Sequence, residues 1–419
     1  MNREIEIHVD LDGQSHVVGR LWPRLNKGRE GASFVYDPSW LASPLRFPLE
    51  PALSLDPGSH HTRQGHSLFG ALGDSAPDRW GRMLMKRMER RTAEREGRPS
   101  RALLEIDYLL MVDDAIRSGA LRFKEAEGRE FLASGNPAIP PLVYLSKLLS
   151  ASDRVVAEKE SDEDLRLLLA PGSSLGGARP KAAVLDANGR LLIAKFPHSE
   201  DEYSVERWSF LALNLARKAG INIPPCRIAS VEDRSVLLVE RFDRQGARRI
   251  PFVSAMSMLG AADGETHSYL EMVDALRQYG ASPKEDQREL WQRVLFSVLI
   301  SNVDDHLRNH GFLYDSEQRG WRLSPAYDIN PVPPDVKARY LSTLIDERDA
   351  EASFDLVLST GAYYGLTAAD MKQMVKMTVD AVMGWRTEAA KIGISRKEVA
   401  RMAGAFEHEA QDAARALVK

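Results

Sequence analysis

One polar stretch of the sequence carries side chains that could support proton transfer and cation binding. It reads Asn302-Val303-Asp304-Asp305-His306-Leu307-Arg308-Asn309. Asp304 lies five residues before Asn309, and a further carboxylate, Asp328, follows downstream. A carboxylate can orient a hydroxyl group and accept its proton, while carboxylate and amide oxygens are the ligands that hard divalent cations prefer. The alternative is a polar surface loop, because Asp and Asn are also common in turns and helix caps.

The elements around this stretch would hold it between a helix and a hairpin. An apolar helical pattern covers residues 290–301, and a strand-like segment follows at 311–314. In protein kinases, the Asp that acts as the base lies five residues before a metal-binding Asn, and a second metal-binding Asp follows in a later loop. The arrangement of Asp304, Asn309 and Asp328 is similar to that pattern.

A glycine-rich segment lies upstream, at residues 172–177, and leads into a predicted hairpin at 182–196. Gly176 and Gly177 would let the backbone approach a ligand closely, and backbone N–H groups there could bind phosphate. Arg179 and Lys181 add positive charge. The segment lacks the spacing of a P-loop and no helix follows it, so a surface loop with glycines at its turns is the alternative.

Two further signals follow in the chain. Lys195 ends an apolar strand pattern and could offer a point charge to phosphates, or it could be an edge lysine that extends to water. A second apolar strand pattern, 236–239, breaks into a polar segment at Glu240 and Phe242, where backbone groups could bind an adenine ring. The alternative there is a buried strand that ends in an ion-paired turn.

Taken together in this order, the motifs resemble those of the HipA family, the serine/threonine-kinase toxins of bacterial toxin–antitoxin modules. The similar segments are Ser174-Leu175-Gly176-Gly177-Ala178-Arg179-Pro180-Lys181, Val239-Glu240-Arg241-Phe242-Asp243-Arg244, Asp304 to Asn309 and Ala326-Tyr327-Asp328-Ile329. The opening hairpin and Trp40-Leu41-Ala42-Ser43 are similar to the family's small N-terminal domain.

The resemblance implies an α+β, two-lobed protein-kinase-like fold with an N-terminal β-rich subdomain and an all-α C-terminal lobe. The expected parts are an N-terminal subdomain at 1–135, a kinase N-lobe with the glycine-rich loop and hinge at 136–245, and a helical C-lobe at 246–419. Within these parts we expect strands at 4–9, 16–21 and 32–36, and helices at 78–91 and 396–418, among others.

The resemblance also implies roles for individual residues. Asp304 would be the catalytic base, and the five-residue spacing favours it over Asp305. Asn309 and Asp328 would bind Mg²⁺, and Glu206 is a candidate partner of Lys195 by position only. The expected ATP-binding residues are Ser174, Gly176, Gly177, Lys181, Lys195, Glu240, Phe242, Tyr327 and His306, the last also taking part in catalysis.

The implied activity is that of an ATP- and Mg²⁺-dependent protein serine/threonine kinase (EC 2.7.11.1). It would phosphorylate an aminoacyl-tRNA synthetase to arrest translation, and would inactivate itself by autophosphorylation at Ser174 or at the adjacent Ser173. The expected partner is a HipB-like helix-turn-helix antitoxin, with operator DNA contacted mainly through that antitoxin. The alternatives are a catalytically weak co-repressor that binds such an antitoxin, and a small-molecule kinase.

Composition limits the other possibilities. The chain has 419 residues, enough for two or three lobes, and its formal net charge of -4 argues against a surface built throughout to bind nucleic acid. The run of arginine and lysine between residues 79 and 101 is either a partner surface or an ion-paired helix face. The sequence shows no signal peptide or membrane span, and Cys226 is the only cysteine, so we expect a cytoplasmic location without membrane contact.

Overall fold

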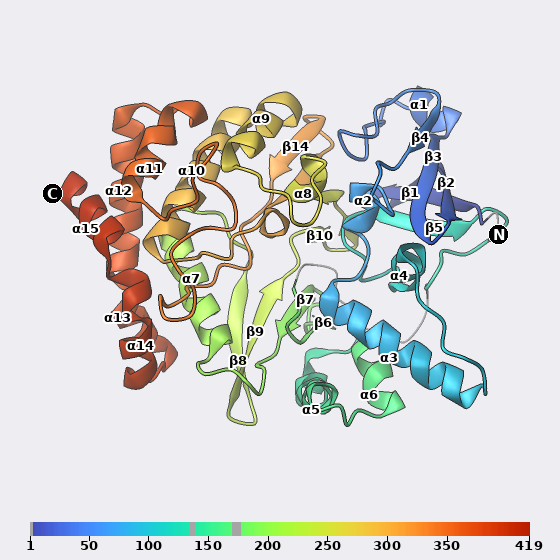
Figure 1. Cartoon of the computed structure of the whole chain (residues 1–419), viewed down its shortest axis with the longest axis horizontal. Coiled ribbons are helices and arrows are strands. Elements are labelled where there is room, and N and C mark those ends of the chain that lie inside the picture. The colour runs from blue at the N-terminus through green and yellow to red at the C-terminus, as the bar shows by residue number, and fades with distance from the viewer. Residues whose placement is uncertain (1–2, 135–138, 170–176) are drawn as a thin grey trace. The chain divides into compact units, whose positions relative to one another are not determined.

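The computed structural model describes residues 3–134, 139–169 and 177–419, which form two compact units (Figure 1). The N-terminal unit comprises Met1–Glu200 and Ser230–Val253, and the C-terminal unit comprises Asp201–Ala229 and Ser254–Lys419. Two strands, β8 (Cys226–Val231) and β12 (Phe252–Ser254), run across the boundaries between these segments. In the described ranges, no helix is both long enough and apolar enough to cross a bilayer.

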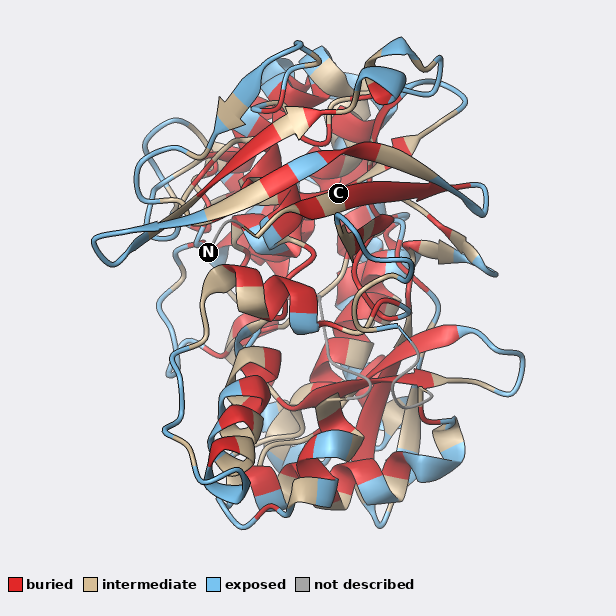
Figure 2. Cartoon of the chain, turned by 90° about the vertical axis from the view of Figure 1, so that its right-hand side faces the viewer, coloured by how far each residue is buried: buried red, intermediate tan, exposed pale blue. Residues whose placement is uncertain are grey.

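The larger sheet of the N-terminal unit has five strands in the order β4-β3-β2-β1-β5, all antiparallel to their neighbours. The strands are β1 (Ile5–Leu11), β2 (Gln14–Asn26), β3 (Arg29–Tyr36), β4 (Ser59–His61) and β5 (Leu121–Glu125). Asp12 and Gly13 both have positive φ, as a tight two-residue hairpin turn requires. The structure therefore confirms the opening hairpin and the third strand, and Figure 2 shows buried residues (red) along these strands.

Seven helices also belong to the described part of this unit. They are α1 (Pro38–Ala42), α2 (Gly70–Gly73), α3 (Arg79–Arg95), α4 (Glu105–Met111), η1 (Leu142–Tyr144), α5 (Leu145–Val156) and α6 (Asp162–Leu169). Asp78 caps α3, because its Oδ1 accepts the backbone N–H of Gly81 at 2.8 Å. Helices α3 and α4 pack on the second sheet through a buried apolar cluster of Met85, Tyr108, Val112, Ile116, Ala183 and Leu191.

The basic residues of α3 bond to acidic residues within the same unit. Arg82 pairs with Glu105, Arg87 with Glu160 at 3.0 Å, and Arg91 with Asp162 at 3.4 Å. These contacts join α3 to α4 and to the segment that begins α6. This part of the basic run is therefore an ion-paired helix face.

The second sheet carries the predicted hairpin and has the order β6-β7-β9-β8. Strand β6 (Lys181–Leu185) pairs with β7 (Leu191–Lys195), which pairs with β9 (Arg234–Glu240). Lys195 therefore lies between Lys181 and Leu237 across the sheet. Two-residue strands β10 (Arg244–Gln245) and β11 (Arg248–Arg249) follow.

The C-terminal unit is mainly helical. Its helices are α7 (Val205–Lys218), α8 (Ala255–Met258), α9 (Tyr269–Tyr279), α10 (Pro283–Leu299), η2 (Leu307–Asn309), α11 (Phe354–Thr360), η3 (Gly361–Tyr364), α12 (Ala368–Met383), α13 (Trp385–Ile392), α14 (Arg396–Phe406) and α15 (Glu409–Val418). The hairpin of β13 (Gly311–Asp315) and β14 (Gly320–Leu323) follows η2. Helix α10 is buried along most of its length, which makes it the core element of this unit.

The structure has two helices where the sequence predicts a single one. The apolar pattern of 396–418 predicts a single helix, but α14 ends at Phe406 and α15 begins at Glu409. His408 caps the second helix, since its ring Nδ1 bonds to the backbone N–H of Gln411 at 3.3 Å. Both helices keep the same apolar periodicity, so the pattern alone did not reveal the break.

Candidate active site

The polar stretch at 302–309 begins where α10 ends, and side chains fix both of its ends. The amide of Asn302 donates to Ser297 Oγ at 3.1 Å, and its Oδ1 accepts the backbone N–H of Asn330 at 3.0 Å. The hydroxyl of Tyr327 donates to the carbonyl of Arg308 at 2.7 Å. The stretch and the later segment at 327–330 are therefore held together within the C-terminal unit.

The two adjacent aspartates lie in opposite environments. Asp305 is buried. Its carboxylate accepts hydrogen bonds from Tyr269 at 2.6 Å and Ser297 at 3.3 Å, and its Oδ1 lies 3.0 Å from His310 Nε2. Burial by itself would raise the pKa of Asp305, yet His310 and Tyr269 hold that pKa below its ordinary value. The side chain of Asp304 is 66% exposed, and its Oδ1 lies 3.0 Å from Lys337 Nζ. Asp304 is thus the carboxylate that a substrate could reach.

Asn309 and Asp328 fit the chemistry of a hard cation. Asn309 is buried and its Nδ2 donates to the Asp304 carbonyl at 3.0 Å, whereas its Oδ1 is buried without a hydrogen-bond partner among the described residues. An unpaired buried amide oxygen is costly unless a ligand satisfies it. Asp328 has a positive φ of 56°, and its Oδ1 accepts from Asn330 Nδ2 at 3.2 Å.

A cation at these two residues would need further ligands. In the described ranges, no three His, Cys, Asp or Glu side chains come together as a metal site. One carboxylate and one amide oxygen suit Mg²⁺, which keeps several waters and is commonly completed by phosphate oxygens. His306 is half-buried at the start of η2, and its Nδ1 has no partner among the described residues.

In the N-terminal unit, Ser173, Ser174 and Gly176 lie outside the described residues. Gly177 is described and has φ of +105°, a conformation that favours glycine. Lys181 is buried, where its Nζ lies 2.5 Å from Asp78 Oδ2 and donates to the Gly177 carbonyl at 3.3 Å. Its ammonium therefore connects the glycine-rich segment to the start of α3.

The other residues expected at the nucleotide lie on β7 and just beyond β9. Lys195 is half-buried at the end of β7. Glu240 ends β9, and its Oε2 accepts from Arg190 at 3.1 Å. The Phe242 ring lies 6.1 Å from that of Phe252.

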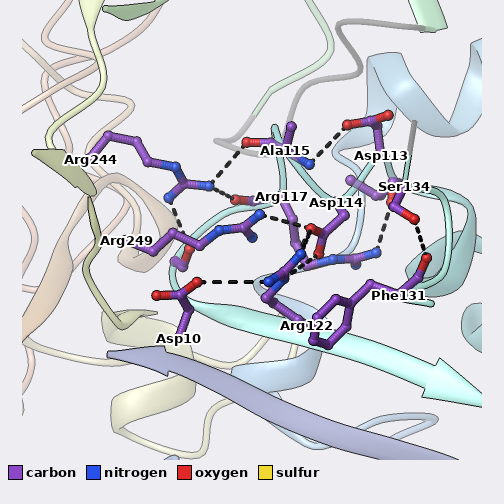
Figure 3. A network of polar contacts seen from close by, with 12 residues as sticks. Asp10, Asp113, Asp114, Ala115, Arg117, Arg122, Phe131, Ser134, Arg244 and Arg249 are labelled. Atoms are coloured by element: carbon purple, nitrogen blue, oxygen red, sulfur yellow. Dashed lines mark hydrogen bonds and ion pairs between the residues drawn. The ribbon is translucent and has the colours of Figure 1, made fainter. Parts of the chain in front are cut away.

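A buried charge network fixes the segment that follows Phe242 (Figure 3). Arg241 and Asp243 form an ion pair in which both side chains are almost fully buried. Arg244 donates to the carbonyls of Ala115 and Arg117. Arg249 and Arg122 converge on Asp114, the latter at 2.6 Å. Opposite charges and backbone carbonyls thus hold residues 239–244, the predicted hinge of the kinase N-lobe, against the 113–122 region of the same unit.

The sequence did not reveal two of these contacts. Asp78 was expected only as the start of a helix, and Lys337 had no expected role. In each ion pair the partners come from elements far apart in the chain, so no local sequence pattern indicates them.

Glu206, the proposed partner of Lys195, is buried in the first turn of α7.

The arrangement of elements is that of a kinase-like α+β protein. The chain is similar to HipA of Shewanella oneidensis, whose structure was solved in complex with HipB and its operator DNA, with a TM-score of 0.66 at 17% identity. The match covers 99% of this chain and 96% of that one. The predicted kinase-like α+β fold is therefore confirmed, although the C-terminal unit, expected to be all-α, also contains the β13–β14 hairpin.

The family follows from the sequence as well. The HipA-like C-terminal domain model matches residues 173–413, more than half of the chain, so the protein belongs to the HipA family. A serine/threonine-protein kinase, CtkA of Helicobacter pylori, is 23% identical over 195 residues, 43% of this chain and 59% of CtkA. A relative from Sinorhizobium fredii is 25% identical over 238 residues, 50% of this chain and 56% of the relative. The chain thus spans little more than half the length of these relatives.

Proposed function

We propose that this protein is an ATP- and Mg²⁺-dependent protein serine/threonine kinase. The observation that carries the proposal is the contrast within one loop. Asp304 is exposed and, among the described residues, only its Oδ1 is engaged, whereas Asn309 Oδ1 is buried and has no hydrogen-bond partner among them. The first is what a general base for a hydroxyl requires, and the second is what a cation ligand requires.

In this proposal the acceptor hydroxyl oxygen attacks the γ-phosphorus of ATP, and the bond from that phosphorus to the β–γ bridging oxygen breaks. The hydroxyl proton passes to the Asp304 carboxylate, and ADP leaves. Mg²⁺, when bound through Asn309 and Asp328, would neutralise charge on the phosphates. Lys195 would contact the phosphates, His306 would lie near the γ-phosphate, and Glu240 and Phe242 would bind the adenine through their backbone.

The family places such kinases in toxin–antitoxin modules, and we propose the same setting here. A HipB-like helix-turn-helix antitoxin would be the partner and an aminoacyl-tRNA synthetase the target. The HipA relative was solved with HipB and operator DNA. Because three arginines of α3 are engaged by acidic residues of their own unit, the antitoxin would be the main reader of DNA. Autophosphorylation at Ser174, or at Ser173, would inactivate the kinase.

Incubation with γ-labelled ATP and Mg²⁺ tests the proposal on the wild type, Asp304→Asn, Ser174→Ala and Asp380→Asn. Asp380 is a matched control, because it is an exposed aspartate 3.0 Å from a lysine, Lys376, on α12. We expect label on the wild type and on Asp380→Asn, and a loss of about 10³-fold in Asp304→Asn. The label should fall sharply in Ser174→Ala if Ser174 is the modified residue; retention would point to Ser173.

An unlabelled wild type that binds no ATP would overturn the proposal and favour the co-repressor function. Label on Asp304→Asn equal to that on the wild type would leave ATP chemistry standing but remove Asp304 from the role of base.

A further inference from the structure

The segment that follows Asp328 packs over the backbone on both sides of Asp304. The backbone N–H and the hydroxyl of Ser342 donate to the Val303 carbonyl at 3.0 and 3.2 Å. The Thr343 hydroxyl donates to the Asp305 carbonyl at 2.7 Å. These bonds fix the carbonyl groups of the two residues that flank Asp304, while the Asp304 side chain itself stays largely exposed.

Lys337, from the same segment, provides the contact to that side chain. Its Nζ lies 3.0 Å from Asp304 Oδ1 and 3.5 Å from Ser342 Oγ. Nearby, Arg339 anchors the segment by donating to the carbonyls of Val298 and Ala352 at 3.1 and 3.0 Å. Lys337 is therefore attached to a fixed piece of backbone.

Stability does not account for this ion pair. The side chains of Lys337 and Asp304 are 43% and 66% exposed, and exposed ion pairs contribute little to the free energy of unfolding. An ordered lysine also loses rotamer freedom, which offsets part of that gain. What the contact does achieve is to restrict the orientation of the Asp304 carboxylate.

The two carboxylate oxygens of Asp304 are thereby distinguished. Lys337 engages Oδ1, and no described residue engages Oδ2. In Asp305, by contrast, Oδ2 accepts from the Tyr269 hydroxyl and Oδ1 lies 3.0 Å from His310 Nε2. A carboxylate held through one oxygen and open at the other is suited to accept a proton in a defined direction.

We propose that Lys337 is a positioning residue for phosphoryl transfer: its ammonium holds the Asp304 carboxylate so that Oδ2 receives the proton of the acceptor hydroxyl. The inference rests on the proposed kinase function and adds a residue from outside the recognised motifs. Lysine has three N–H donors, so it can keep the contact with Oδ1 while also lying near Ser342. Arginine would retain the charge and part of this geometry, whereas methionine would retain only the volume of the side chain.

The test measures single-turnover autophosphorylation at saturating Mg²⁺-ATP for the wild type, Lys337→Met, Lys337→Arg and Lys376→Met. The Lys376–Asp380 pair is the matched control, with the same residue types, the same 3.0 Å distance and similar exposure. We expect Lys337→Met to lower the maximal rate about 10- to 100-fold. The ATP concentration that gives half of the maximal rate, and the melting temperature, should stay unchanged. Lys337→Arg should recover most of the rate, and Lys376→Met should match the wild type.

A maximal rate for Lys337→Met within twofold of the wild type would overturn the inference and leave the kinase proposal standing. The inference would also be overturned if the rate of Lys337→Met fell only because the variant binds ATP more weakly. NMR of ¹³C-methylated lysines reports the ion pair without activity, since the Lys337 signal should shift in Asp304→Asn. If that shift is seen while the wild type transfers no phosphate, the kinase proposal itself fails, and the positioning role fails with it.

Discussion

Two lysine–aspartate pairs, one in each unit, use the same chemistry in opposite surroundings. In the N-terminal unit the side chains of Asp78 and Lys181 are 4% and 2% exposed and lie 2.5 Å apart. In the C-terminal unit those of Asp304 and Lys337 are largely exposed and 3.0 Å apart. A buried pair depends on its partner because each charge has lost its water. An exposed pair keeps its water, so either member can exchange its partner for a substrate at little cost.

The comparison separates a structural pair from one available for chemistry. Asp78 also caps α3, and Lys181 also contacts the Gly177 carbonyl, so the buried pair joins a helix start to the end of the glycine-rich segment. Asp304 caps nothing, and only one of its carboxylate oxygens is engaged within the described residues.

Breaking the buried pair should have the largest effect on stability. Asp78→Asn keeps a good helix cap but removes the carboxylate charge that lies 2.5 Å from the buried Lys181 ammonium. We expect the free energy of unfolding, measured with urea, to fall by about 3–5 kcal/mol. Asp37→Asn should change it by less than about 0.5 kcal/mol, because this carboxylate at the cap of α1 accepts exposed hydrogen bonds from the backbone and side chain of Ser39. If Asp78→Asn lowered the free energy of unfolding by less than about 1 kcal/mol, the buried pair would contribute no more to stability than an exposed ion pair does.

A buried carboxyl whose pKa is raised by burial provides an intermediate case. Glu50 is buried, its Oε2 accepts the backbone N–H of Ala71, and burial raises its pKa to about 7. Because the folded-state pKa lies above the unfolded value, its contribution to stability is complete below about pH 4.3 and is lost as the pH rises through 7. At pH 8 the wild type should therefore be less stable than Glu50→Gln by up to about 3 kcal/mol.

Thermal melting at pH 5 and pH 8 measures this dependence. The advantage of Glu50→Gln should be several-fold smaller at pH 5 than at pH 8. Glu94→Gln, at an exposed position of α3, should show no such dependence. A Glu50→Gln advantage of equal size at both pH values would show that packing, and not ionisation, is responsible.

The sequence was informative where the signal is local. The alternation around Asp12-Gly13 predicted the opening hairpin, and the Asp78 cap predicted the start of α3, because both depend on residues within a few positions. The spacing to Asn309 favoured Asp304 over Asp305, but could not show the environments that distinguish them. Those depend on Tyr269 from α9 and Lys337 from a later segment. Contacts between distant elements leave no trace in a local pattern.

The smallest effect is expected for the stability of the exposed pair. Lys337→Met and Asp304→Asn should each change the free energy of unfolding by less than about 1 kcal/mol, because water replaces the lost partner in either variant. In a double-mutant cycle, the coupling between the two residues should likewise stay below about 1 kcal/mol in the free energy of unfolding.

The same double-mutant cycle, measured on the rate of phosphoryl transfer, should be strongly non-additive, because Lys337 acts only through Asp304. Once the carboxylate is gone, removing the lysine should not lower the rate further. Additive losses of rate would mean that Lys337 acts independently of Asp304, and a coupling of several kcal/mol in unfolding would mean that the exposed pair is structural after all.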